Sequence, residues 1–446
     1  MSSAGTGVDR GTPPPPDAVT GFRFPDYVRH RLDNGLTVLA AASARGPLVY
    51  SALLFPAGAD RDPAGGDGTA TLVGGLTDEG TAGRTALDIA AAVEDLGGRL
   101  GTGADWDVGH LDIQVLSRHA DGALRLLAEL ATGSMLPGEE LERQRRRRLA
   151  DLLRRKSDPS YLAGDRFAAA VYAGTPYGHT LQGDEETTAR LDRDGLLAFY
   201  RRCYVLSKAV LVTVGDHDPQ TLLRRAEEVF GALPGGVPPG EPTVEPPPLA
   251  GVDWQIVDRA HAVQAELRIG HAGPPRSHPD FVALSVMNAL LGGKFTSRIN
   301  LNLRERHGYT YGAHSTFSSR RGPGPFVVRT AVAKEVAVAA AREVLGELER
   351  VTQDAVGAEE LDDAKNYLIG TFPYTLQTVS GLLDRLETLA VHGLPADYYD
   401  RLPAAIRAVS RQDVLRVAQA HLRPRDLVVV AVGPEAEIRA QLKGPS

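Results

Sequence analysis

The stretch "VYSALLFPAGA" (residues 49–59) decides the fold, because a similar stretch, "VQAELRIGHAG", returns at residues 263–273. Three more pairs follow in the same order: residues 123–130 with 341–348, the "EEL" beginning at Glu139 with the one beginning at Glu359, and residues 194–215 with 413–433. The four offsets lie between 214 and 220 residues. Ordered matches at a nearly constant offset indicate that the chain contains two homologous halves.

Each half combines the patterns of strands and of helices. Alternating or continuous β-branched and apolar runs predict strands, namely residues 35–43, 48–55, 110–117 and 210–215. Apolar residues at i, i+3, i+4 and i+7 followed by glycine predict amphipathic helices, namely residues 85–98 and 119–133. The pattern predicts an α+β fold of two homologous tandem domains, each a sheet packed with helices.

The length and the proline distribution predict where these domains begin and end. A chain of 446 residues exceeds the roughly 250–300 residues of a single core. Residues 233–250 are dense in proline and glycine, as an interdomain linker would be. We therefore expect an N-terminal domain over residues 21–232 and a C-terminal domain over residues 251–446. The Pro-rich residues 1–20 are expected to form a disordered tail.

Composition excludes several classes of function. The net charge is −7, from 49 Lys and Arg against 56 Asp and Glu, which lacks the basic excess typical of nucleic-acid binding. Cys203 is the only cysteine, so an intrachain disulfide and a cysteine-ligated zinc site are both excluded. No stretch approaches the ~18 apolar residues of a membrane span. These features predict a cytoplasmic chain that binds neither nucleic acid nor membrane.

Two stretches resemble a known family, "GTATLVGGLTDEGT" at residues 68–81 and "LRERHGYTYGAHSTF" at residues 303–317. The chain resembles the pitrilysin and insulinase-like zinc metallopeptidases, which include the mitochondrial processing peptidases, over nearly its whole length from Tyr27. In that family the first half carries G-x-x-H-x-x-E-H on a helix, and the second half carries L-R-E-x-x-G-x-x-Y. The resemblance implies the two-domain fold of this family.

The metal-binding part of the family pattern is missing from this chain. Two histidines at i and i+4 lie on one helix face and bind one zinc, and the intervening glutamate activates a water molecule. The resemblance aligns Thr71 and Gly75 with the two histidines, Gly74 with the glutamate, and Asp151 with the third, acidic ligand. None of the twelve histidines lies four residues from another. The sequence therefore predicts that this chain binds no metal and carries no cofactor.

Other features around these positions have plainer interpretations. Gly74 and Gly75 each cost a helix about 1 kcal/mol of stability relative to alanine. Sequence drift after loss of the metal is the favoured explanation for these glycines, and room for another backbone is the alternative. Asp78 and Glu79 follow the helix and are expected to cap or solvate its end. The seven arginines within residues 142–158 accompany leucines at helical spacing. A solvated helix face is therefore favoured over nucleic-acid binding, with a partner-docking face as the alternative.

Arg304 and Tyr311 are the candidate functional residues. They lie seven residues apart, and Gly308 between them permits a bend. The resemblance implies that this arginine and this tyrosine point into the peptidase chamber from the second domain. The guanidinium can then donate to a substrate carbonyl, and the phenol can donate to the oxyanion that develops as water attacks.

Loss of the zinc motif beside an intact Arg304 and Tyr311 predicts a role in a pair of chains. In the family, one chain can hold zinc while the other supplies the Arg/Tyr pair. We expect a non-catalytic subunit of a heterodimeric metallopeptidase that is inactive alone and clamps a peptide substrate opposite the zinc of a homologous partner. Two alternatives stay open: a structural protein, as in family members that became core subunits of respiratory complexes, and a peptide-binding scaffold homodimer.

Overall fold

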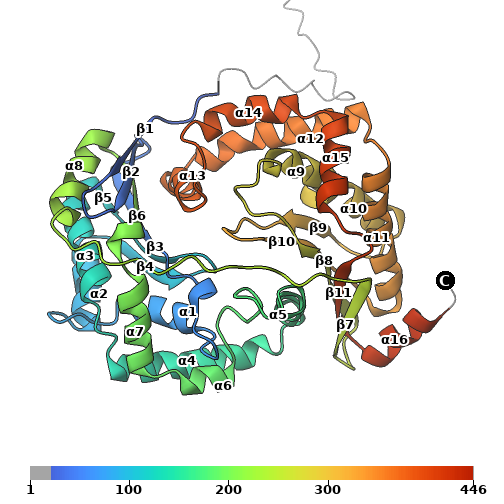
Figure 1. The fold of residues 1–446 in the computed structure, drawn as a ribbon, viewed down its shortest axis with the longest axis horizontal. Coiled ribbons are helices and arrows are strands. Elements are labelled where there is room, and N and C mark those ends of the chain that lie inside the picture. Colours follow the sequence, from blue (N-terminus) through green and yellow to red (C-terminus); the bar gives the residue numbers. More distant parts are fainter. Residues whose placement is uncertain (1–21, 445–446) are drawn as a thin grey trace, which may run out of the picture.

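The computed structural model describes residues 22–444 and contains two β-sheets that are packed with helices (Figure 1). The predicted α+β class is confirmed. The tail predicted over residues 1–20 lies outside the described residues. We call residues 22–230 the N-half and residues 252–444 the C-half; the segment from residue 234 to residue 250 contains neither helix nor strand.

The N-half contains six strands and eight α-helices, which are β1 (Tyr27–Arg31), β2 (Thr37–Ala42), β3 (Leu48–Phe55), α1 (Thr69–Gly74), α2 (Ala86–Asp95), β4 (Arg99–Ala104), β5 (Gly109–Leu116), α3 (Ala120–Gly133), α4 (Gly138–Arg155), α5 (Pro159–Val171), α6 (Glu185–Arg190), α7 (Arg193–Cys203), β6 (Val210–Gly215) and α8 (Pro219–Phe230). The described part of the C-half contains β7 (Val252–Asp258), β8 (Gln264–Ala272), α9 (Phe281–Asn288), α10 (Arg298–Asn300), β9 (Ala313–Phe317), β10 (Pro325–Ala333), α11 (Ala337–Gln353), α12 (Ala358–Thr371), α13 (Val379–Val391), α14 (Tyr398–Ala408), α15 (Arg411–His421), β11 (Leu427–Gly433) and α16 (Glu435–Lys443). Two π-helical segments, Ala289–Gly293 and Leu301–Arg306, flank α10.

The two sheets have the same topology. The N-half order is β1-β2-β6-β3-β5-β4 and the C-half order is β7-β11-β8-β10-β9, so the sheets differ only by the additional strand β1. Strand β6 is parallel to β2 and antiparallel to β3, and β11 is parallel to β7 and antiparallel to β8 in the same way. The repeat seen in the sequence is therefore a repeat of structure.

Local sequence signals explain individual elements. Helix α2 begins with a capping box, in which Thr85 accepts from the backbone of Asp88 and the Asp88 side chain accepts from the backbone of Thr85. Strand β5 alternates buried and partly exposed residues along its whole length, which is the period of a strand with one face in the core. Both elements lie where the sequence pattern predicts them.

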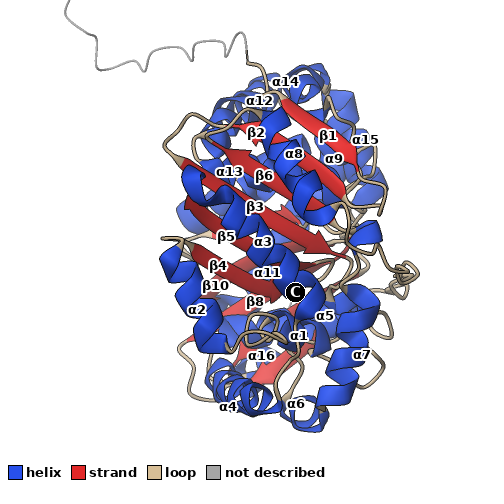
Figure 2. Ribbon diagram, turned by 90° about the vertical axis from the view of Figure 1, so that its left-hand side faces the viewer, coloured by secondary structure: helices blue, strands red, loops and turns tan. Residues whose placement is uncertain are grey.

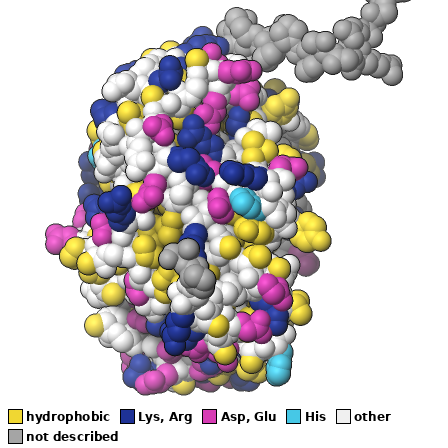
Figure 3. All heavy atoms as spheres, turned by 90° about the vertical axis from the view of Figure 1, so that its right-hand side faces the viewer, with side chains coloured by type: hydrophobic (Ala, Val, Ile, Leu, Met, Phe, Trp, Pro, Cys, Tyr) yellow, Lys and Arg dark blue, Asp and Glu magenta, His cyan; other side chains and the backbone are white. Residues whose placement is uncertain are grey.

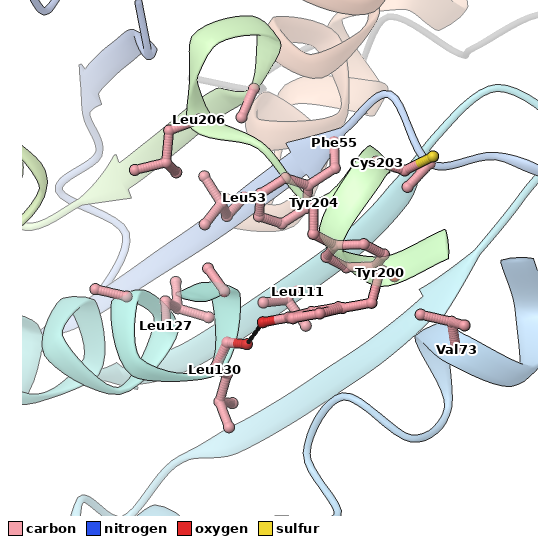
Figure 4. Close-up of a cluster of buried hydrophobic side chains, with 14 of the residues drawn as sticks. Leu53, Phe55, Val73, Leu111, Leu127, Leu130, Tyr200, Cys203, Tyr204 and Leu206 are labelled. Carbon is pink, nitrogen blue, oxygen red and sulfur yellow. Dashed lines mark hydrogen bonds between the residues drawn. The ribbon is translucent and has the colours of Figure 1, made fainter. Parts of the chain in front are cut away.

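The outer face of the N-half sheet holds that half's own core. Helices α3 and α8 lie across this face (Figure 2). Leu53 of β3 and Leu111 of β5 are fully buried beneath them. The Tyr200 hydroxyl of α7 donates to the Leu130 carbonyl at 2.8 Å, so this buried phenol is satisfied within the apolar cluster (Figure 4). The N-half core is thus built from side chains of its own sheet and helices.

The inner face of each sheet is covered by a helix from the other half. Helix α13 of the C-half packs on β3 and β6, and helix α5 of the N-half packs on β8 and β11. Apolar side chains fill both contacts. In the first, Leu382, Leu386 and Leu389 meet Ala52, Leu54, Val212 and Val214; in the second, Ala163, Phe167 and Val171 meet Val327, Val428, Val430 and Val432. Each half therefore completes the core of the other.

A loop of the C-half also reaches into the N-half through polar contacts. This loop, residues 318–324, connects β9 to β10. The Arg321 backbone N–H donates to the Asp107 carboxylate at 2.9 Å, and the Arg321 guanidinium lies 3.3 Å from Asp60 and 3.5 Å from Glu241 of the connecting segment. Burial raises the pKa of Asp60 to about 7, although the Arg321 charge opposes this shift. One arginine thus joins both halves and the segment between them.

Helix composition and surface charge add two further observations. Within residues 22–444, no helix has both the length and the apolar character needed to cross a bilayer. On the outer face of the C-half, acidic and basic side chains are interspersed (Figure 3).

The exchanged helices predict a large stability cost for one core substitution. Leu386 of α13 is fully buried against the other half's sheet, so Leu386→Ala should lower the free energy of unfolding by about 2–5 kcal/mol. The helix and the sheet belong to different halves, so the two halves should unfold together. The fluorescence of Trp106 in the N-half and of Trp254 in the C-half should therefore give the same denaturation midpoint. Urea denaturation followed by tryptophan fluorescence, with single-tryptophan variants, measures both.

The control is Leu87→Ala, because Leu87 is 82% exposed. This change should stay within about 0.5 kcal/mol of the wild type. Equal effects of the two substitutions, or separate midpoints for the two halves, would contradict the shared-core description.

Candidate functional site

Helix α1 carries the positions that the family pattern assigns to zinc chemistry: Thr71, Gly74 and Gly75. The helix begins after Gly68, whose φ of +87° is in the left-handed region that favours glycine. The Asp62 carboxylate accepts two backbone N–H groups at this end of the helix, each at 2.7 Å. These bonds fix the start of α1 and occupy both oxygens of Asp62.

Gly74 lies against the backbone of the edge strand β4. A Cβ at Gly74 would lie 2.5 Å from the carbonyl carbon of Gly103, whereas a Cβ at Gly75 would meet no other atom closer than 3.5 Å. The space that a general-base glutamate would need at position 74 is therefore occupied by backbone. For Gly74 the structure supports close approach of another backbone, and not the drift that the sequence favoured.

An arginine of α4 occupies the space in front of Thr71. The Arg148 guanidinium donates to the Thr71 hydroxyl at 3.0 Å and to the Gly68 carbonyl at 2.7 Å. Burial lowers the pKa of Arg148 to about 10, and the nearby charge of Asp62 opposes this shift. Asp151, which the resemblance assigned as the third ligand, instead pairs with Arg154 at 3.0 Å near the surface. The residue of α4 that reaches α1 at Thr71 is thus a cation.

These residues do not fit a zinc ion. Zinc in proteins takes thiolate, imidazole or carboxylate ligands, and positions 71, 74 and 75 supply a hydroxyl and two glycines. The Arg148 guanidinium would repel a cation placed beside Thr71. The metal-binding chemistry of the family is therefore not available at this site.

The contacts of α4 correct the prediction that its run of arginines forms a solvated helix face. The Arg143 guanidinium pairs with Glu79, and the Gln144 amide donates to the same carboxylate at 2.7 Å. Arg145 donates to three carbonyls at the end of α6. The run of arginines spans more than one helical turn, so its members lie on several faces. Only part of this helix is the solvated face that the sequence predicted.

Arg304 and Tyr311 lie in the C-half, on either side of a turn. Arg304 lies within the π-helical segment Leu301–Arg306, and its guanidinium carbon lies 4.5 Å from the centroid of the Phe295 ring. Tyr311 is 92% exposed. Gly308 between them has φ of +63°, as the predicted bend requires.

The structure groups these residues in two separate places. Thr71 and Gly74 meet α4 and β4, as described above, while Arg304 and Tyr311 lie together in the C-half. Among residues 22–444, no hydrogen bond or ion pair joins Arg304 or Tyr311 to the α1 positions. Arg148 was not among the predicted site residues, although the spacing of Leu141, Arg145, Arg148 and Leu152 places it on the buried side of α4.

Two family models match the chain. Residues 37–185 match the model described as "Insulinase (Peptidase family M16)", and residues 190–368 match "Peptidase M16 inactive domain". Among curated proteins, the chain is 25% identical over 86% of its length to "Non-peptidase homolog YmxG" of Helicobacter pylori, covering 89% of that protein. It is also 25% identical to an "uncharacterized zinc protease" of Streptomyces coelicolor, covering 76% of each chain.

Solved structures share the fold. A "peptidase M16 inactive domain" from Pseudomonas fluorescens superposes with a TM-score of 0.85 at 26% identity, covering 92% of this chain and 98% of that one. A "protease from Helicobacter pylori" superposes with the same TM-score at 20% identity, covering 92% of this chain and all of the other. Both likenesses extend over the N-half and the C-half together.

The contacts of Arg148 predict that it stabilises the N-half. Arg148→Ala would leave the buried Thr71 hydroxyl and Gly68 carbonyl without this donor and the buried Asp62 without a nearby cation. We expect a loss of about 3 kcal/mol in the free energy of unfolding. The matched control is Arg147→Ala, one residue away on the exposed side, which should change stability by less than about 0.5 kcal/mol. Equal losses would show that the Arg148 contacts contribute nothing.

The two glycines of α1 should respond to alanine in opposite directions. Gly74→Ala forces α1 away from the Gly103 backbone and should cost about 1–3 kcal/mol, as overpacking does. Gly75→Ala meets only ordinary contacts and should be neutral or stabilise by up to about 1 kcal/mol. Thermal unfolding of both variants measures the difference. A stabilised Gly74→Ala variant would contradict the close packing of α1 on β4.

Proposed function

The chain belongs to the M16 (insulinase) peptidase family as a member without the family's zinc ligands, and we propose that it works as the non-catalytic subunit of a heterodimeric metallopeptidase. In this proposal a homologous partner holds the zinc and activates the water. This chain, which carries no cofactor, clamps the peptide substrate with Arg304 and Tyr311. The exposed Tyr311, combined with an α1 that cannot bind zinc, is the observation that carries the proposal.

The turn that carries Tyr311 is held firmly. The Thr310 hydroxyl donates to the Ala331 carbonyl of β10 at 2.8 Å and to the Gly312 carbonyl at 2.9 Å. The Asn300 side chain accepts the Ala313 N–H at 3.0 Å on the other side. A large aromatic side chain that is 92% exposed on an anchored turn is suited to contact another molecule with little loss of conformational entropy.

The Arg304 guanidinium is partly exposed and incompletely paired. Its Nη1 atom is buried and has no hydrogen-bond partner in the described residues, and its nearest carboxylate, Glu305, lies 3.6 Å away. The ring beneath it, Phe295, is 61% exposed, and its backbone carbonyl accepts from Asn300 at 2.6 Å. The guanidinium therefore rests on a positioned aromatic ring, which favours a fixed orientation.

These two side chains would act at different stages of peptide hydrolysis. The Arg304 guanidinium donates to a substrate carbonyl, which holds the peptide in both the ground state and the transition state. The Tyr311 hydroxyl donates to the oxyanion at the scissile carbonyl, which develops only as water attacks. Neither group activates water, so the proposal requires the partner. We place the pair in the cytoplasm, which the single cysteine of the chain supports.

The pairing is tested by co-expressing this chain with an M16 chain from the same genome that has an intact His-x-x-Glu-His motif. The two chains should co-purify, and peptide cleavage should require both. Chelator-sensitive cleavage by this chain alone would rule out the non-catalytic assignment. A stable complex without cleavage would instead support the alternative, a structural or peptide-binding scaffold.

Tyr311→Phe tests the role of the hydroxyl within that mixture. The change keeps the ring and deletes one oxyanion donor, which typically costs ~10²–10³ in kcat. Arg304→Ala should raise KM as well, because a carbonyl clamp acts before the transition state. The matched control is Tyr374→Phe, at another tyrosine that is 68% exposed, and its kcat should not change. If Tyr311→Phe leaves kcat within about twofold of the wild type, the proposed clamp is wrong.

A further inference from the structure

A groove of about 340 Å³ runs between α5 of the N-half and β10 of the C-half. Helix α5 lies beside the inner face of the C-half sheet (Figure 1). One stripe of α5 at helical spacing lines the groove, formed by Tyr161, Gly164, Asp165, Ala168 and Tyr172. The opposite wall consists of residues of β8 and β10 and of the loop before β10, namely Arg268, Arg320, Pro325, Val327 and Arg329.

Two arginines stand side by side at one end of the groove. Arg329 of β10 lies directly opposite Arg268 of β8 in the antiparallel register. Like charges in opposed positions of a sheet are destabilising unless something compensates them. Arg268 is compensated, because its guanidinium donates to Glu266 at 2.5 Å and to the Ser160 hydroxyl at 2.6 Å.

Arg329 has no such partner. Within residues 22–444 its guanidinium forms no hydrogen bond or ion pair, although it lines the groove. Arg329 is an exposed residue overall, yet partial burial of its guanidinium lowers its pKa, and the charge of Arg268 lowers it further. A positive charge in this environment favours an anionic ligand, and a guanidinium suits a carboxylate because it can form two parallel hydrogen bonds.

Asp165 lines the same groove from α5. Its carboxylate also forms no hydrogen bond or ion pair within residues 22–444, and burial raises its pKa to about 6 against the opposing charge of Arg155. Such a group repels a dianion such as phosphate and accepts N–H donors. The groove thus has an unpartnered cation and an unpartnered hydrogen-bond acceptor.

The groove also has apolar walls and open space beside α5. Phe167 and Val327 form part of its walls and are themselves buried. A Cβ built on Gly164 meets no atom within 4 Å, so the space beside this glycine is open. A volume of about 340 Å³ lies at the small end for ligand pockets, roughly 300–1,000 Å³.

We propose that this groove binds the C-terminal residue of a peptide with an apolar side chain. The terminal carboxylate pairs with Arg329, the backbone N–H of the same residue donates to Asp165, and the side chain lies against Phe167 and Val327. This inference rests on the proposed function in so far as a peptide is the ligand. It adds a recognition site for the end of that peptide, away from Arg304 and Tyr311.

The test uses the full chain alone and two fluorescein-labelled decapeptides of the same sequence ending in leucine, one with a free carboxylate and one with a terminal amide. Fluorescence anisotropy measures both dissociation constants. The free acid should bind at least ~10-fold more tightly, the lower end for a charge-assisted hydrogen bond. Arg329→Gln should remove this preference, whereas Arg190→Gln, at an exposed arginine of α6, should preserve it.

A second variant blocks the groove without touching its charges. Gly164→Leu places a side chain in the open space beside α5 and replaces a helical glycine, so it should fold normally and bind neither peptide. Equal affinity for acid and amide, unchanged binding by Gly164→Leu, or no binding of either peptide up to millimolar concentration would overturn the inference. Displacement of the free acid by equimolar inorganic phosphate would also overturn it, because it would mark a general anion site.

Failure of the groove proposal can be distinguished from failure of the proposed function. The binding assay requires neither the partner chain nor peptide cleavage, and it tests the roles of Arg329 and Gly164. The proposed clamp is tested by measuring the kcat of the two-chain mixture that contains Tyr311→Phe. If the chain prefers the free acid while Tyr311→Phe leaves the kcat of the mixture unchanged, the groove is supported and the clamp is rejected.

Discussion

The exchange of helices between the two halves is the constraint on which the rest of the structure depends. Each sheet buries its outer face with its own helices and its inner face with a helix of the other half, α13 on β3 and β6 and α5 on β8 and β11. An apolar sheet face left open would be a large hydrophobic patch, which monomeric proteins rarely expose. The same exchange brings α5 beside β10 and so creates the groove with Arg329. The two halves therefore share one folded core, and the groove exists only where they pack together.

Helix α1 occupies the place of the family's zinc-binding helix but is held by other contacts. In place of an ion, the Arg148 guanidinium supplies a positive charge that joins α4 to Thr71 and to the start of α1. Gly74 allows α1 to press on β4, so the helix is held by backbone packing as well. The contacts of α1 are thus structural, and any part that this chain plays in proteolysis must come from other residues. Tyr311, exposed on an anchored turn, is the residue best placed to supply it.

The sequence predicted the fold well because the repeat and the strand and helix periods are local signals. The offset between residues 49–59 and 263–273 anticipated two sheets of equal topology, and the helix predicted at residues 85–98 is α2. The exchange of α5 and α13 was not predictable in this way, because a periodic apolar stripe does not say which sheet it covers. For the same reason the arginines of α4 were assigned to a solvated face. The residue spacing places Arg148 on the buried side of α4, but its contact with Thr71 depends on the packing of α4 against α1, which a single sequence does not record.

The zinc content of the purified chain tests the central claim most directly. Elemental analysis after incubation with zinc and exhaustive dialysis should find no stoichiometric metal, because positions 71, 74 and 75 supply no ligand and Arg148 repels a cation. The variant Thr71→His with Gly74→Glu and Gly75→His should also fail to retain zinc, since Arg148 still lies in front of residue 71 and the Gly103 backbone excludes the glutamate. One tightly held zinc per chain that persists after His421→Ala, which removes the cluster of His278, Asp280 and His421 as a possible metal site, would contradict the account.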